Sequence, residues 1–263
     1  MTPLASILIF TALSGVLSAA VAGLFLLVPS RPRSRSIPHM VSFATGALLG
    51  TALLALIPHA MEGAGPQHLH EVGIALVIGI GVFFVLEKFL LWRHCHADES
   101  ETHDVHVHAH HNHSDQASGV LVLVGDALHN SLDGVLIAAA FLTDWHLGVV
   151  TTFAIMAHEI PQEIGNFAVL LHAGMSRGQA LFWNLATSLT AVIGGVAGYF
   201  ALRQSLALLP YALAIAAASL LYVAVADLIP GLHRRTDARA SVAQVVLLVA
   251  GILVVAYAEQ HAH

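Results

Sequence analysis

The sequence predicts an all-α polytopic membrane protein: a bundle of eight transmembrane helices with a His-rich loop between the third and the fourth. Two observations support this fold class. The 263 residues are 57% hydrophobic and only 10% charged, and their mean hydropathy is +0.78, too high for a soluble domain of this size. The apolar residues also gather in separate runs of about 20 residues, the length of a helix that crosses a bilayer.

These runs are treated as the helices of one membrane domain that covers residues 1–263. At 1.5 Å of rise per residue, each run is long enough to cross the hydrocarbon core. Polar segments separate the runs and provide the connections on either side of the membrane. The expected helices cover residues 5–28, 38–59, 72–92, 118–141, 147–171, 180–202, 207–229 and 241–258.

The distribution of Lys and Arg predicts the orientation of the bundle. With eight helices, nine of the ten basic residues fall on one side of the membrane, and only Arg203 falls on the other. Basic residues mark the cytoplasmic side, so we expect both termini to be periplasmic or extracellular. The nine residues are Arg31, Arg33, Arg35, Lys88, Arg93, Arg177, Arg234, Arg235 and Arg239.

Histidine is the outlier of the composition, with 19 residues, eight of which lie between 94 and 113. The segment 94–116 is polar and has no apolar face, so we expect a disordered cytoplasmic loop. Its imidazoles and carboxylates would bind borderline divalent cations weakly and exchangeably; the alternative is a solvated tether. Its histidines are His94, His96, His103, His106, His108, His110, His111 and His113.

Two of the expected helices carry charge near their middle, where a membrane helix ordinarily has none. On the run 118–141, four polar residues share one helical face; on the run 147–171, five do. A carboxylate near the bilayer centre costs roughly 2.5–3.5 kcal/mol, so the four acidic residues need an offsetting interaction. The two sets are Asp126, His129, Asn130 and Asp133, and His158, Glu159, Gln162, Glu163 and Asn166.

This chemistry indicates a cage for a divalent metal cation between the two helices. Imidazole nitrogens with carboxylate and amide oxygens suit Zn²⁺, Fe²⁺, Mn²⁺ or Cd²⁺ and lack the thiolates that Cu(I) prefers. The donors outnumber those that one ion needs, which favours two adjacent positions or successive positions along a path. The metal is therefore interpreted as a substrate, and no organic cofactor is expected. The predicted ligands are His129, Asn130, Asp133, His158, Glu159, Gln162 and Glu163.

Other polar residues are candidates for accessory or pathway roles. His59 and Glu62 lie at the predicted outer mouth, whereas Asp126 and His172 lie toward the inner end. On the run 180–202, Asn184, Thr187 and Ser188 share a face, and small polar residues of this kind either join helices or assist a ligand set. The accessory or pathway residues are Asp126, Asn166, His172, Thr187, Ser188, His59 and Glu62.

Several alternatives to a metal transporter remain open. In one alternative the cluster only fixes helix packing, and in another it holds a closed structural metal site. An intramembrane metalloprotease is disfavoured because His158-Glu159 begins like HExxH but Gln162 replaces the second His, so we expect no enzyme. A proton-coupled exporter of the six-helix cation-efflux type also carries intramembrane His/Asp sites. The net charge of −6 and the absence of a basic face exclude nucleic acid as a partner.

The motifs HNSLDG and HEIPQEIGNFAVLL resemble the ZIP (Zrt/Irt-like) family of divalent metal transporters, in particular the branch with HE-x-PHE-x-GD on its fifth helix. This chain departs from that pattern at Gln162 and Asn166. The resemblance implies zinc import into the cytoplasm, a homodimer and an elevator-like movement. It also assigns His129, Asp133, His158, Gln162 and Glu163 as primary ligands, with Asn130 and Glu159 at a second position. The Ala-rich composition favours a bacterial inner membrane.

Overall fold

The computed structural model describes residues 2–25, 29–99, 111–233 and 238–261. Within these residues the chain forms helices joined by short turns, and no strand occurs. The predicted all-α class is therefore confirmed. The α-helices are α1 (Pro3–Phe25), α2 (Ser30–Gly50), α3 (Ile57–Ala64), α4 (Leu69–Glu99), α5 (His111–Thr143), α6 (Trp145–His172), α7 (Arg177–Ser188), α8 (Thr190–Leu202), α9 (Leu209–Tyr222), α10 (Ile229–His233) and α11 (Ala238–Gln260).

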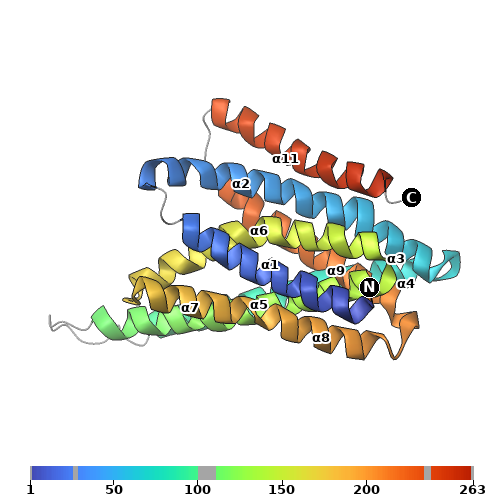
Figure 1. The fold of residues 1–263 in the computed structure, drawn as a ribbon, viewed down its shortest axis with the longest axis horizontal. Helices are drawn as coiled ribbons and strands as arrows, with labels where there is room; N and C mark the ends of the chain where they lie inside the picture. The colour runs from blue at the N-terminus through green and yellow to red at the C-terminus, as the bar shows by residue number, and fades with distance from the viewer. Residues whose placement is uncertain (1, 26–28, 100–110, 234–237, 262–263) are drawn as a thin grey trace.

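Seven helical segments of the described chain are long and apolar enough to cross a membrane. Three of them are composite: α2 continues into α3, α7 into α8, and α9 into α10. The remaining long helix, α6, has 28 residues, and its central polar residues lower its hydropathy. The described ends of the chain lie at the same end of the bundle in Figure 1, as an even number of crossings requires.

Two π-helical turns interrupt the composite helices at matching sequences. Thr51–Leu56 joins α2 to α3, and Val223–Leu228 joins α9 to α10. Each turn ends in Leu and is followed by Ile-Pro. Proline lacks an N–H group and its ring clashes with the carbonyl one turn earlier, and a wider π turn accommodates both effects.

Helix α6 begins at a strong cap. The Asp144 side chain accepts hydrogen bonds from the backbone N–H groups of His146 at 2.7 Å and Leu147 at 3.1 Å. Partial burial raises the pKa of Asp144, but the hydrogen bonds from these N–H groups outweigh that effect and lower it below its ordinary value. This cap fixes the start of the helix that carries His158 fourteen positions into its length.

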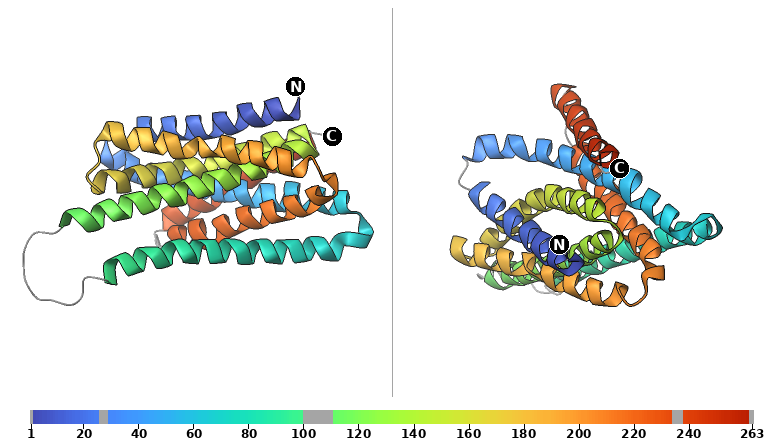
Figure 2. Two further views of the ribbon diagram at one scale, coloured as in Figure 1. Left: turned by 90° about the horizontal axis from the view of Figure 1, so that it is seen from below. Right: turned by 45° about the vertical axis from the view of Figure 1, so that its right-hand side comes forward.

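The bundle consists of helix pairs that pack along their lengths. Helix α5 packs against α8 and α6, and α1 packs against α6. Helix α4 packs against α9, while α11 lies on the outer side of α2 (Figure 1). In Figure 2, α4 and the start of α5 project beyond the other helices at one end. Helices α5 and α6 therefore occupy the interior, flanked by α1, α7 and α8.

The His-rich segment lies at this projecting end. Helix α4 continues to Glu99 and α5 begins at His111, so both helices extend into the range 94–116, in which no helix was predicted. His94 and His96 belong to α4, and His111 and His113 belong to α5. His103, His106, His108 and His110 lie outside the described residues, and for them the disordered loop stays a prediction.

Glycines permit the close approach of α5 and α8. A Cβ atom on Gly194 would overlap the backbone carbonyl of Ser131 on α5, and one on Gly134 would overlap the carbonyl of Ala191 on α8. Small residues allow membrane helices to touch backbone to backbone. The position of α5 beside α8 thus depends on these two residues having no side chain.

We expect Gly194→Ala to lower the thermal unfolding midpoint of the detergent-solubilised protein, because the added methyl group forces α8 away from α5. Overpacking of this kind costs about 1–3 kcal/mol. Gly178→Ala is the matched control, since a Cβ atom there meets no other atom within 4 Å and Ala favours the helix. Equal midpoints for the two variants would contradict the close-packing argument.

Candidate metal centre

Helices α5 and α6 bring two imidazole nitrogens and one carboxylate oxygen to a single point. His129 Nε2 lies 3.2 Å from His158 Nε2, and each of these nitrogens lies 3.5 Å from Asp133 Oδ2. The three atoms all lie within 4.8 Å of one another. We call this set the metal trio. Asp133 and His158 are 1% exposed, so the trio lies inside the bundle.

The arrangement of the two rings favours an electrophile between them. The Nδ1 atom of His158 lies 3.4 Å from the carbonyl oxygen of Ala154. A carbonyl only accepts hydrogen bonds, so this contact places the ring proton on Nδ1 and leaves a lone pair on Nε2. That lone pair faces Nε2 of His129 at 3.2 Å, so a proton or a cation between the two nitrogens would bind both rings. The ring of His129 is partly accessible, with 22% of its side chain exposed.

Among the described residues, five buried carboxylate or amide oxygens of α5, α6 and α7 have no hydrogen bond, and one of them is the trio's own Asp133 Oδ2. Buried acceptors are ordinarily hydrogen-bonded, and a group of unpartnered ones indicates a missing ion or donor. All five are acceptors of the type that binds Zn²⁺ or a harder divalent cation. They are Asn130 Oδ1, Asp133 Oδ2, Glu159 Oε1, Glu163 Oε2 and Asn184 Oδ1.

In three of these residues, one polar atom of the side chain forms a hydrogen bond and the remaining oxygen does not. Glu159 accepts a hydrogen bond from Ser14 of α1 at 3.0 Å through its other oxygen. Glu163 does the same with Ser188 of α7 at 2.9 Å. The amide nitrogen of Asn130 donates to the backbone carbonyl of Asp126 at 3.0 Å. Each residue is thus oriented by one atom and presents the other.

Asp126 forms a separate network about one helical turn from the trio. Its Oδ1 atom accepts from the Asn166 amide at 2.7 Å and from the Gln162 amide at 3.4 Å. Its Oδ2 atom accepts from the Thr187 hydroxyl at 2.5 Å. The four residues join α5, α6 and α7. Both carboxylate oxygens are occupied by donors, so Asp126 here serves as a hydrogen-bond acceptor.

The structure does not place every candidate ligand at the trio. Gln162 is directed to Asp126, and its predicted role as a metal ligand stays a prediction. Thr187 and Ser188 do lie in the polar cluster, as hydrogen-bond donors to its carboxylates.

Three of the accessory or pathway candidates, His59, Glu62 and His172, lie apart from the cluster. His59 is on α3, where its ring contacts the Ala55 carbonyl at 2.9 Å, and Glu62 is exposed. His172 is exposed at the end of α6.

Ser14 belongs to the polar cluster, although the sequence did not single it out. It belongs to a buried polar face of α1 that comprises Ser6, Thr11, Ser14 and Ser18. Short polar side chains at helical spacing in an apolar helix were the available signal. Such residues are common at helix contacts, and only the packing of α1 against α6 relates this face to Glu159.

Comparison with known proteins identifies the family to which this sequence belongs. The ZIP zinc transporter family model matches residues 3–259. The chain belongs to the ZIP zinc transporter family. This finding confirms the resemblance inferred from the helix motifs.

Individual ZIP relatives cover most of this chain. Zinc transporter ZIP13 of Pongo abelii is 34% identical over 230 residues, which span 82% of this chain and 65% of the relative. Zinc transporter ZIP4 of Mus musculus is 32% identical over 282 residues, spanning 84% and 42%. Zinc transporter ZIP13 of Danio rerio is 29% identical over 94% of this chain and 86% of its own length. The chain therefore spans less than two thirds of the first two relatives.

We expect Asn166→Asp to destabilise the metal-free protein, because it replaces a donor to Asp126 with a second carboxylate at hydrogen-bond distance. The loss should be about 1–3 kcal/mol. Added Zn²⁺ should bridge the two carboxylates and raise the thermal midpoint more than it does in the wild type. Asn166→Ala removes the donor without adding charge and should show no such extra rise. An Asn166→Asp protein as stable as wild type in chelator would contradict this account.

Proposed function

We propose that this ZIP family member carries Zn²⁺ across the membrane into the cytoplasm through the metal trio and the neighbouring oxygens. The observation that carries the proposal is the convergence of two Nε2 atoms and one carboxylate oxygen within 4.8 Å of one another, in the middle of the long helices α5 and α6. Two imidazoles with a carboxylate form a ligand set that Zn²⁺ commonly accepts. Fe²⁺, Mn²⁺ and Cd²⁺ share enough of these preferences to be further substrates.

The trio is the first of two positions in this proposal. Three protein ligands leave coordination sites open for water, as in zinc sites that exchange their ligands. The free oxygens of Asn130, Glu159 and Glu163 supply the second position. Gln162 joins the trio when its amide leaves Asp126. An ion that leaves the first position therefore meets ligands of the second position before it has lost all of its own.

The direction and setting of transport follow from charge and family. The nine-to-one bias of basic residues supports cytoplasmic connections at one side and periplasmic or extracellular termini at the other. His59 and Glu62 then lie at the entry side, and Asp126 and His172 toward the exit. The composition supports a bacterial inner membrane. The His-rich segment would receive the ion on the cytoplasmic side.

The proposed movement is an elevator-like displacement of α1, α5, α6, α7 and α8 against the remaining helices. Support comes from the packing, because these five helices contact one another and contribute all the polar residues of the cluster. Such a movement would carry the site as a unit from one side to the other. A homodimer, which the family resemblance implies, would hold the remaining helices still.

Flux into proteoliposomes that contain a metal-sensitive dye tests the proposal. Wild-type protein should show saturable uptake of Zn²⁺. His129→Ala should abolish saturable uptake, because it removes one of the three ligands, while His146→Ala should retain it, since His146 is exposed at the start of α6. Uptake by His129→Ala at the wild-type rate would exclude His129 as a ligand. Vesicles with a single protein orientation distinguish import from the alternative, proton-coupled export.

Deletion of residues 103–113 tests the role of the His-rich segment. We expect uptake to fall but not to cease, because weak, exchangeable ligands raise the local ion concentration without forming the central site. The measurement is initial flux at subsaturating Zn²⁺. A variant in which Gly and Ser replace residues 103–113 one for one is the control for the length of this segment. Complete loss of uptake in a folded deletion variant would instead make this segment an obligatory relay.

A further inference from the structure

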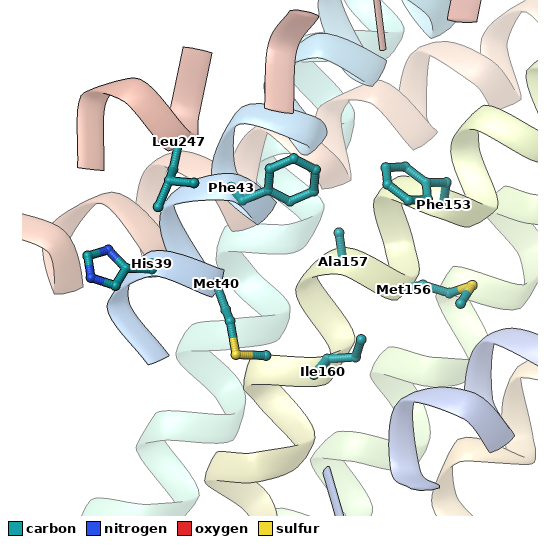
Figure 3. Close-up of a pocket in the computed structure, with 8 residues that line it drawn as sticks. All are labelled: His39, Met40, Phe43, Phe153, Met156, Ala157, Ile160 and Leu247. Carbon is teal, nitrogen blue, oxygen red and sulfur yellow. The ribbon is translucent and has the colours of Figure 1, made fainter. Parts of the chain in front are cut away.

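An apolar groove lies on the side of α6 that faces away from the metal trio. It has a volume of about 420 Å³ and is built by α2, α6 and α11 (Figure 3). Within the part of the chain that the structure describes, its walls are apolar except for one imidazole. The lining residues are His39, Met40, Phe43, Phe153, Met156, Ala157, Ile160 and Leu247.

The groove and the metal ligands occupy opposite faces of one helix. Phe153, Met156, Ala157 and Ile160 follow the spacing i, i+3, i+4, i+7 and line the groove, whereas His158 and Glu159 point to the other side. Phe43 and Phe153 meet edge to face at one end, with ring centroids 6.3 Å apart. Phe153 is 42% exposed, so the groove opens to the lateral surface of the bundle.

The apolar walls of the groove favour an apolar ligand over water. A water molecule needs two to four polar partners, and only His39 offers one. The groove lies within membrane-crossing segments, since His39 belongs to the span Ser36–Ala64 and Leu247 to the span Ala240–Gln260. Such walls suit the hydrocarbon that a bilayer presents beside these segments. Its volume lies in the usual range for ligand sites, about 300–1,000 Å³.

Basic residues near the groove in the sequence favour a lipid with an anionic headgroup. The sequence places three arginines just before the span of each wall that α2 and α11 provide. Clusters of basic residues at the membrane surface attract anionic lipids. In the sequence, His39 follows the first of these clusters by four residues. The arginines are Arg31, Arg33 and Arg35 before the first span, and Arg234, Arg235 and Arg239 before the second.

We propose that this groove binds one acyl chain of an anionic phospholipid, with the headgroup at the end of the membrane where α2 and α11 begin. The lipid fills the space between α6 and the α2–α11 pair and contacts the back of the helix that carries His158. The site is defined without reference to metal, so it stands or falls independently of the transport function.

Native mass spectrometry of the full-length protein in detergent measures this binding. The protein is titrated with phosphatidylglycerol or with phosphatidylcholine of identical acyl chains, and metal is omitted. One phosphatidylglycerol per protomer should be retained, and phosphatidylcholine should be retained less. Leu247→Trp should weaken retention about tenfold because the indole fills the groove. Leu24→Trp is the matched control, because Leu24 is 65% exposed on α1 and lies at the same end of the bundle.

Equal retention by the two tryptophan variants would overturn the proposed site, and equal retention of the two lipids would overturn the anionic headgroup. A second measurement uses wild-type protein and therefore does not depend on a variant that folds. Phosphatidylglycerol with a photoreactive acyl chain is irradiated in vesicles with the protein, and labelled peptides are mapped. Labelling should concentrate on Met40 and Met156. A uniform distribution over all lipid-facing helices would contradict the proposal.

Discussion

Burial of four carboxylates inside a membrane bundle is the constraint on which the rest of this structure depends. Each costs roughly 2.5–3.5 kcal/mol at the bilayer centre, so the surrounding helices must supply compensating interactions. Helix α1 supplies the hydroxyl of Ser14, and α7 supplies those of Ser188 and Thr187. Ser14 and Ser188 each donate to one oxygen of Glu159 and Glu163 respectively, and Thr187 donates to Asp126, while the second oxygen of each glutamate has no hydrogen bond. The hydrogen bonds therefore leave one oxygen of each glutamate without a donor. Oxygens of this kind favour a cation as the ligand.

The packing around α5 and α6 follows from this requirement. The hydroxyl donors are short, so α1 and α7, which carry them, must lie close to α5 and α6. Glycine at 134 and 194 allows α8, which follows α7, to lie directly against α5. The break between α7 and α8 at Leu189 contributes as well. Next to it, the Thr190 hydroxyl donates to the carbonyl of Ala127 on α5 at 2.7 Å. A continuous helix through this point would carry these groups past α5 at a different angle.

Much of the architecture could be predicted from the sequence, because hydropathy and helical period are local properties. The spacing of His129 and Asp133, one turn apart, was sufficient to predict that they share an ion, and the structure brings them together with His158. The conformation of Gln162 could not be predicted in this way. Its amide reaches either the trio or Asp126, and the choice depends on rotamers and on donors from α7.

Interhelical partners were also beyond the reach of the sequence. The buried face of α1 follows a pattern that equally fits a simple helix contact, and only its position against α6 gives Ser14 a role with Glu159. The π turns before Pro58 and Pro230 are a similar case. Proline predicts a disturbance, but a kink and a π turn relieve it equally well, and the neighbouring helices decide between them.

The geometry of the trio bears on how tightly a cation can be held. A closed four-ligand shell would retain Zn²⁺ strongly and release it slowly, which suits a structural site. Three converging ligands bind less tightly, and the free oxygens of Asn130, Glu159 and Glu163 allow replacement of one ligand at a time. Stepwise exchange avoids a fully stripped ion inside the bilayer, where the cost of desolvation would be greatest. In the metal-free protein, the incomplete ligand shell leaves acceptor oxygens without hydrogen bonds. A site for a moving ion requires a shell that is incomplete in this way.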